Sequence, residues 1–239
     1  SNKKATHMWC KLPKRVSEEH VDALVTRIMK NECISRKDGL FNKKFFSNYT
    51  PAQSNLDLLK LIHSDVWPQL CYGSTFELPV IDHATLLIKK RNSVATGLHQ
   101  DRVYWINKEQ TATLFSVWIA LEDMTYENGG IMLSEGTRTE IVDMNRFNTG
   151  LLHEHTNVKT SLGEFPLVMA NPLASRLKQS IRCVELKKGE AIAFDSFEPH
   201  MSGKNIQSSP RLAMKITYCE GKKRSKYLIK IGQLRDYKN

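Results

Sequence analysis

The sequence lacks several features that would place it in a narrow class at once. No apolar run approaches the roughly 18 residues needed to span a bilayer. The five cysteines are widely spread and include no Cys-x-x-Cys pair, so neither a disulfide framework nor a cysteine zinc site is indicated. Regular repeats and low-complexity tracts are also missing, which argues against solenoids and disordered arrays. The sequence therefore predicts a globular protein that does not cross a membrane.

The N-terminal residues and the net charge bear on where the protein acts and on what it binds. Ser1 to His7 lack the apolar core of a secretory signal, so we expect an intracellular, cytoplasmic protein. The formal charge of +10 and the pI near 9.4 favour anionic partners. A solvated, lysine-rich surface explains this charge more simply than a nucleic-acid site, because the basic residues are spread along the chain. Even the cluster Lys222-Lys223-Arg224 is interpreted as a charged connector between two strands.

The 239 residues suit one domain, which we divide into three parts. Helical patterns fill about residues 15–75, with one helix from about Val16 to Asn31 and another that starts at Ser54 and is kinked or ended by Pro68. The apolar face expected for the first helix consists of Val21, Leu24, Val25, Ile28 and Met29. Short β-rich runs then predict a sheet core over about residues 80–232. The expected strands lie at 84–89, 111–121, 130–133, 184–187, 191–194, 212–219 and 227–231. A long mixed stretch at about 137–182 is interpreted as a lid-like insertion.

The segment His99-Gln100-Asp101 raises the question of a metal site. By itself it is better explained by a hydrogen-bonded pair at the end of a strand. His200 adds a second imidazole just after the expected strand 191–194, beside the strand-breaking Pro199. One carboxylate and two imidazoles form the facial triad of non-haem Fe(II) oxygenases, which leaves three positions open. We therefore predict that His99, Asp101 and His200 bind one metal ion.

Arg211 follows at the start of the next expected strand, which we expect to lie antiparallel and adjacent to the strand of His200. A guanidinium can hold a carboxylate through two hydrogen bonds, as a carboxylate-ended co-substrate requires. Trp118, on the strand 111–121, is interpreted equally well as core or as a wall of that co-substrate pocket. Lys89 is a further candidate contact, although a solvated strand lysine is the preferred interpretation.

Together these segments resemble the phytanoyl-CoA dioxygenase family of Fe(II)- and 2-oxoglutarate-dependent oxygenases. The resemblance covers roughly residues 80 to 220. It rests on His99-Gln100-Asp101, Trp118-Ile119-Ala120-Leu121-Glu122-Asp123, the turn Glu127-Asn128-Gly129-Gly130, His200-Met201-Ser202 and Arg211. It departs where the family often continues after this turn with Pro-Gly-Ser-His, since this chain has Ser134-Glu135-Gly136-Thr137, which alters the substrate-side wall.

The resemblance implies a mainly β fold, a double-stranded β-helix or cupin-like jelly roll backed by N-terminal helices. It implies Fe(II) on His99, Asp101 and His200, and 2-oxoglutarate held by Arg211 with Ser202 assisting and Trp118 lining the pocket. The implied reaction uses dioxygen to hydroxylate or otherwise oxidise a small-molecule metabolite, and it releases succinate and CO2. Because Asp101 supplies a carboxylate, the resemblance favours hydroxylation or a related oxidation over halogenation.

Two other classes stay open. The same chemistry on a nucleic-acid or protein substrate fits the basic pI, but alkylated-base demethylases carry an arginine at the position of Thr217. A jelly-roll binding protein without catalysis would be expected to have lost at least one of the correlated site residues. We therefore expect a small-molecule substrate, with an anionic group favoured by the charge, and the sequence leaves the oligomeric state open.

The insertion contains His153-Glu154-His155, which does not have the spacing of a His-Glu-x-x-His zinc site. A role in the lid or on the surface is the preferred interpretation. If the insertion covers the active site, His153, His155 and Arg138 become candidate substrate contacts.

Overall fold

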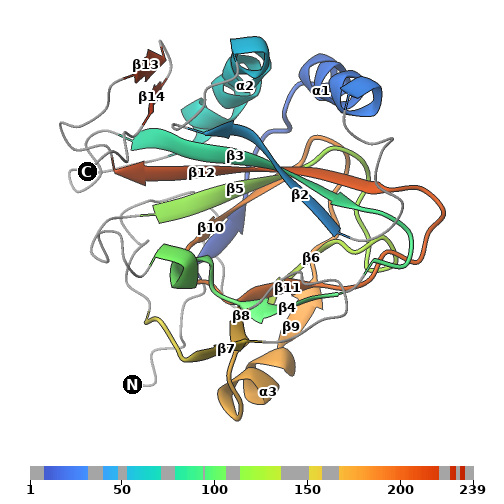
Figure 1. The fold of residues 1–239 in the computed structure, drawn as a ribbon, viewed down its shortest axis with the longest axis vertical. Coiled ribbons are helices and arrows are strands. Elements are labelled where there is room, and N and C mark those ends of the chain that lie inside the picture. The colour runs from blue at the N-terminus through green and yellow to red at the C-terminus, as the bar shows by residue number, and fades with distance from the viewer. Residues whose placement is uncertain are drawn as a thin grey trace.

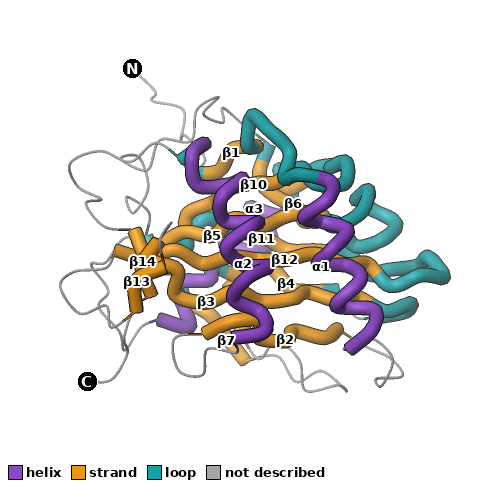
Figure 2. Tube along the Cα trace, turned by 90° about the horizontal axis from the view of Figure 1, so that it is seen from above, coloured by secondary structure: helices purple, strands orange, loops and turns teal. Residues whose placement is uncertain are grey.

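Two facing β-sheets form the centre of the molecule, with two helices on the outer face of the larger sheet (Figures 1 and 2). The computed structural model describes residues 8–31, 40–47, 53–70, 79–93, 95–105, 114–135, 151–157, 167–220, 227–229 and 232–234. Within these ranges the strands pair antiparallel, apart from one short parallel contact between β14 and β3. The predicted jelly-roll fold with N-terminal helices is confirmed.

The larger sheet runs in the order β1-β10-β5-β12-β3-β14-β13, and β2 pairs with the other edge of β3. Its strands are β1 (Trp9–Lys11), β2 (Leu40–Ser47), β3 (Pro79–Lys89), β5 (Leu114–Ala120), β10 (Ala191–Asp195), β12 (Arg211–Glu220), β13 (Tyr227–Ile229) and β14 (Gly232–Leu234).

The smaller sheet runs β4-β11-β6-β9 and carries both site histidines. Its strands are β4 (Thr96–His99), β6 (Ile131–Ser134), β9 (Ile181–Cys183) and β11 (His200–Ser202). A separate pair, β7 (His155–Asn157) with β8 (Leu167–Met169), precedes the short helix α3 (Leu173–Lys178), and all three fall in the stretch interpreted as a lid. Its role as a lid stays a prediction.

Helices α1 (Glu18–Asn31) and α2 (Gln53–Val66) begin and end close to where the sequence predicts them. Glu18 and Glu19 fall in the first turn of α1, where acidic side chains interact well with the helix dipole. After α2 the chain tightens into the 3-10 turn η1 (Trp67–Gln69), which contains Pro68. None of the helices in the described ranges is long and apolar enough to cross a membrane.

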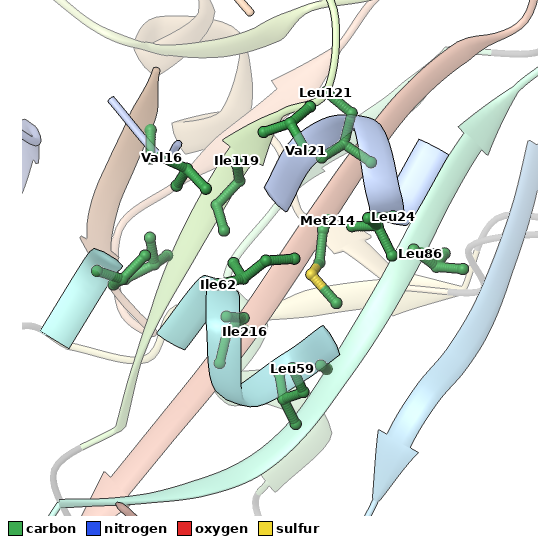
Figure 3. Close-up of a cluster of buried hydrophobic side chains, with 14 of the residues drawn as sticks. Val16, Val21, Leu24, Leu59, Ile62, Leu86, Ile119, Leu121, Met214 and Ile216 are labelled. Carbon is green, nitrogen blue, oxygen red and sulfur yellow. The ribbon is translucent and has the colours of Figure 1, made fainter. Parts of the chain in front are cut away.

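The helices pack their apolar stripes on the larger sheet. Val21 and Leu24 from α1 and Leu59 and Ile62 from α2 lie over Ile216 and its neighbours on the sheet (Figure 3). This core is almost free of solvent, with exposures of 0% for these five side chains. Burial of each such side chain contributes about 1.5–3 kcal/mol, so the layer gives the sheet a firm backing.

A second core fills the space between the two sheets. It joins Trp118 and Phe194 of the larger sheet to Ile131 and Leu133 of the smaller one. This core occupies one part of the barrel interior, and the polar site described below occupies the rest.

Two local predictions are wrong. Residues 184–187 form no strand, and Leu186 makes only an isolated bridge to Met124, because the opposing chain turns away at Tyr126–Gly129. Met29 was expected on the apolar face of the first helix, yet it is 47% exposed. At about 100° per residue it lies about 80° round the helix from Val21, at the edge of the buried stripe.

Candidate metal and 2-oxoglutarate site

The two histidines face each other across paired strands. His200 on β11 is in register with His99 on β4, and their ring centroids lie 4.3 Å apart. Each Nδ1 donates a hydrogen bond to the carbonyl two residues earlier, His99 to Gly97 (2.8 Å) and His200 to Glu198 (2.9 Å). Because a carbonyl can only accept, both protons sit on Nδ1 and both Nε2 lone pairs are left for a metal.

Asp101 completes the cluster from the first residue of η2 (Asp101–Trp105). Its Oδ1 atom lies 3.3 Å from Nε2 of His99 and 3.3 Å from Nε2 of His200. Each residue offers one ligand atom, all within 4.8 Å of one another, and all three residues are buried. Two imidazoles and one carboxylate are the donor set that suits Fe(II), so the residues fit the expected metal.

The electrostatics keep His99 and Asp101 in their metal-binding forms. Burial, and then the neighbouring His200, lower the pKa of His99 below its ordinary value. Burial alone would raise the pKa of Asp101, but the Lys215 ammonium and the two histidines hold it well below the ordinary value. At neutral pH His99 is therefore neutral and Asp101 is charged, as metal binding requires.

Arg102 ties together the two loops that carry Asp101 and His200. Its Nε donates to Oγ of Ser196 (2.9 Å), and its backbone N–H donates to the carbonyl of Ser196 (2.9 Å). Its guanidinium also lies 4.4 Å from the centroid of the Phe197 ring. The chain just after Asp101 is thereby fixed against the chain just before His200.

Gln100, between the first two candidate ligands, fixes the segment 151–155 to the same place. Its Nε2 donates to the carbonyls of Leu151 (2.7 Å) and Phe197 (2.8 Å), and its Oε1 accepts from the backbone N–H of His153 (2.9 Å). Its own backbone N–H donates to Nε2 of His155 (3.1 Å). The His153-Glu154-His155 segment therefore packs against the metal loop, although its histidines are not part of the ligand cluster.

Arg211 lies in the same pocket and is only 2% exposed. Two of its nitrogens donate to carbonyls, NH1 to Gly129 (2.5 Å) and NH2 to Leu87 (3.3 Å). Its Nε is buried and has no hydrogen-bond partner among the described residues. Burial lowers the pKa of Arg211 to about 10, so the side chain stays charged at neutral pH. A buried cation with an unpaired donor is the arrangement that a carboxylate ligand would complete.

The turn Glu127-Asn128-Gly129-Gly130 presents the Gly129 carbonyl to Arg211. Gly129 has φ +80°, a conformation that side chains rarely tolerate, and an added Cβ would come within 2.9 Å of Cδ of Lys89. Asn128 closes the turn, since its Oδ1 accepts from Thr125 N–H (2.9 Å) and its Nδ2 donates to the carbonyl of Asp123 (2.8 Å).

One pocket joins the metal cluster to Arg211 and contains about 480 Å³ of non-atom space, its open mouth included. Trp118 forms part of its wall and also belongs to the core between the sheets, so both interpretations of this residue hold. The lining residues are Leu87, Lys89, Thr96, His99, Trp118, Ile131, His200, Met201, Ser202, Arg211 and Lys215. Every residue predicted for the site except Asp101 is therefore in the lining, and Asp101 adjoins it through the two histidines.

Two expectations about this pocket are wrong. Lys89 is 1% exposed, and its Nζ donates to the carbonyl of Gly203 (2.6 Å), so it is a buried pocket residue and not a solvated strand lysine. Arg211 does not lie beside the strand of His200, because β12 belongs to the larger sheet and β11 to the smaller one. The two residues meet across the barrel interior, because the sheets face each other.

Lys215 is the site residue that the sequence analysis missed. Its Nζ donates to Oδ2 of Asp101 (2.8 Å), and it lines the pocket. Residues two and four apart on a strand share a face, so its spacing from Arg211 was the available signal. Arg138 and the cluster Lys222-Lys223-Arg224 lie outside the described residues.

The sequence model of the phytanoyl-CoA dioxygenase (PhyH) family matches residues 16–213. The chain belongs to this family. Membership confirms the expected enzyme class, an Fe(II)- and 2-oxoglutarate-dependent oxygenase, and the His99-Asp101-His200 cluster supplies the donors that fit the expected iron. No curated protein matches the chain.

Solved structures share the fold at low sequence identity. EvdO2 from Micromonospora carbonacea var. aurantiaca, complexed with 2-oxoglutarate, is 18% identical with a TM-score of 0.65, covering 90% of this chain and 87% of that chain. The epimerase SnoN, in complex with Fe3+, alpha ketoglutarate and nogalamycin RO, is 16% identical with a TM-score of 0.60, covering 90% and 80%. EctD from S. alaskensis, in its apoform, is 16% identical with a TM-score of 0.55, covering 97% and 79%.

Proposed function

We propose that this member of the family oxidises a C–H bond of a small-molecule metabolite, with His99, Asp101 and His200 as the iron ligands and Arg211 as the anchor of 2-oxoglutarate. One observation carries the proposal. Three buried donors converge within 4.8 Å, and a buried arginine with an unpaired Nε lies in the same pocket. Hydroxylation is the expected outcome, because Asp101 supplies a carboxylate where halogenation would need an open position.

When bound, the iron and 2-oxoglutarate supply an oxidant from dioxygen, and the co-substrate leaves as succinate and CO2. The protein's own residues bind and orient. Nε2 of His99, Nε2 of His200 and Oδ1 of Asp101 would hold the metal, and three protein ligands would leave positions for the co-substrate and dioxygen. Arg211 holds the far carboxylate of 2-oxoglutarate, and Ser202 assists with its hydroxyl. Trp118, Leu87 and Ile131 form apolar walls that exclude water from the reacting end.

A small molecule is the favoured substrate. The pocket lies inside the barrel, and the neighbouring SnoN structure holds nogalamycin RO, which is a small molecule. The formal charge of +10 favours a substrate that carries an anionic group. Thr217 bonds to Ser116 (3.0 Å) and brings no charge to the position where base demethylases carry a second arginine.

Succinate formation from 2-oxoglutarate under air tests the reaction, first without substrate and then with a panel of metabolites. We expect slow uncoupled turnover in the wild type and stimulation by one class of small molecule. His200→Ala and Asp101→Ala should each lower the Fe(II)-dependent rate by on the order of a hundredfold or more, since even outer-sphere changes cost 10–100-fold. His20→Ala is a matched control, because His20 pairs with Asp65 away from the site.

The same assay separates the other classes. Stimulation by single-stranded DNA or RNA, or by peptides alone, would overturn the small-molecule assignment. Absence of Fe(II) and 2-oxoglutarate binding in the wild type would overturn the catalytic proposal and leave the jelly-roll binding protein.

A further inference from the structure

Lys215 interacts with Asp101, the carboxylate of the candidate metal site. It lies on β12 four residues after Arg211, and its Nζ donates to Oδ2 of Asp101 at 2.8 Å. Its side chain is 18% exposed and that of Asp101 is 12% exposed, so the pair is largely shielded from water. Water and salt screen a shielded ion pair less than an exposed one, and breaking it would leave a buried charge without a partner. The Lys215 ammonium therefore restrains the Asp101 carboxylate.

The two oxygens of Asp101 have different neighbours. Oδ1 lies 3.3 Å from Nε2 of both His99 and His200, and Oδ2 lies against the Lys215 ammonium. The terminal torsion of a carboxylate is broad, so a carboxylate without such a contact would turn easily. The ammonium therefore fixes which oxygen of Asp101 faces the two histidines.

Strand geometry places Lys215 where Arg211 cannot reach. Arg211 and Lys215 share one face of the strand because side chains alternate between the faces. Four residues at about 3.3 Å each put their Cα atoms about 13 Å apart. Lys215 pairs in register with Trp118 on one side and Thr85 on the other, and Arg211 pairs with Lys89. One cation is thus left for the far carboxylate of 2-oxoglutarate and the other for the ligand Asp101.

We propose that Lys215 is a positioning residue that keeps Asp101 a one-oxygen ligand and so preserves an open metal position. The inference rests on the proposed metal site. A carboxylate that turned and bound through both oxygens would occupy one of the three positions that the co-substrate and dioxygen need. Lys215 competes with the metal for Oδ2 and prevents this.

Binding of Mn(II) in place of Fe(II), measured without dioxygen so that no turnover takes place, tests the inference with Lys215→Met. Losing the ammonium removes repulsion of the metal and frees Oδ2 to bind it, so Mn(II) should bind about tenfold tighter. 2-Oxoglutarate should bind the Mn(II) protein about tenfold more weakly, because one open position is taken. Mn(II) titration by electron paramagnetic resonance and 2-oxoglutarate titration by calorimetry give the two constants.

Water proton relaxation reports how many water ligands the bound Mn(II) keeps. A general structural defect would not lower that number. Relaxation enhancement per bound Mn(II) should fall in Lys215→Met, since a second Asp101 oxygen displaces a water ligand. Lys215→Arg, which keeps a cation at the position, should restore the wild-type value. Lys187→Met is the control, because Lys187 is an exposed lysine that pairs with Asp123 outside the pocket.

Each result bears on one claim. Weaker binding of both Mn(II) and 2-oxoglutarate, or unchanged constants and relaxation, would overturn the role of Lys215 while the proposed function stands. If the wild type binds neither, the proposed function itself falls. Should Lys215→Met fail to fold, Lys215→Gln removes the charge with a polar side chain and is read in the same way.

Discussion

The two faces of strand β12 carry side chains of opposite character. Both are buried, yet one is packed with aliphatic and aromatic side chains and the other carries two cations. Leu212, Met214, Ile216 and Tyr218 belong to the core under the helices, where Figure 3 shows Met214 and Ile216. Arg211, Ala213, Lys215 and Thr217 alternate with them along the strand. A buried apolar side chain needs only good packing, but a buried charge needs a partner. The charged face therefore indicates function, and the apolar face indicates stability.

Arg211→Met should have the largest effect and act on binding alone. Without the guanidinium the far carboxylate of 2-oxoglutarate has no cation, and truncating one side of a buried charge pair costs 2–5 kcal/mol or more. We expect KM for 2-oxoglutarate to rise on the order of a thousandfold. Succinate release against co-substrate concentration measures this, with the more exposed Arg182→Met as control. An unchanged KM would mean that the charged face is not the co-substrate site.

Met214→Ala tests the other face of the same strand. Met214 is 0% exposed, and truncation of a buried methionine leaves a cavity that costs about 2–5 kcal/mol. We expect the free energy of unfolding in urea to fall by that amount, while KM for 2-oxoglutarate stays within about twofold. A large change in KM at full folding would show that the two faces are not separable.

Glu122→Gln should change stability by a smaller, pH-dependent amount. Burial raises the pKa of Glu122 to about 7, although the Arg211 charge opposes the shift. The unfolded carboxyl titrates near 4.5, so charging it disfavours the folded state increasingly from pH 4.5 to 7.

The Gln variant escapes that penalty. Its stability should equal that of the wild type below pH 4.5 and exceed it by about 1–2 kcal/mol above pH 7, after allowance for solvent screening of this half-buried group. Thermal denaturation at a series of pH values measures the difference. A constant offset across the series would contradict the raised pKa.

Thr217→Val should have the smallest effect. The Thr217 hydroxyl hydrogen-bonds to Oγ of Ser116 at 3.0 Å, and Thr217 is not among the residues that line the pocket. We expect a loss of about 0.5–1.5 kcal/mol in unfolding free energy and unchanged kinetics. A loss of 2-oxoglutarate turnover in a folded Thr217→Val protein would extend the catalytic surface along the strand.

Local patterns in the sequence were enough to place most elements. The apolar spacing of the first helix, Pro68 after the second and the alternation of 212–219 each correspond to an element that the structure contains. They succeed because a helix or strand periodicity depends on residues close together in the chain. They fail at 184–187, where the outcome depended on a turn some 60 residues away.

The sequence by itself determined the residue types of the site, with His99, Asp101, His200 and Arg211 all in one pocket region. Only the tertiary structure decided that Arg211 faces the cluster from the opposite sheet, that Lys89 is buried, and that Lys215 holds Asp101 from 114 positions away. The physical reason is that alternation along a strand fixes which residues share a face. The side chains that this face meets depend on the pairing and stacking of strands far apart in the chain.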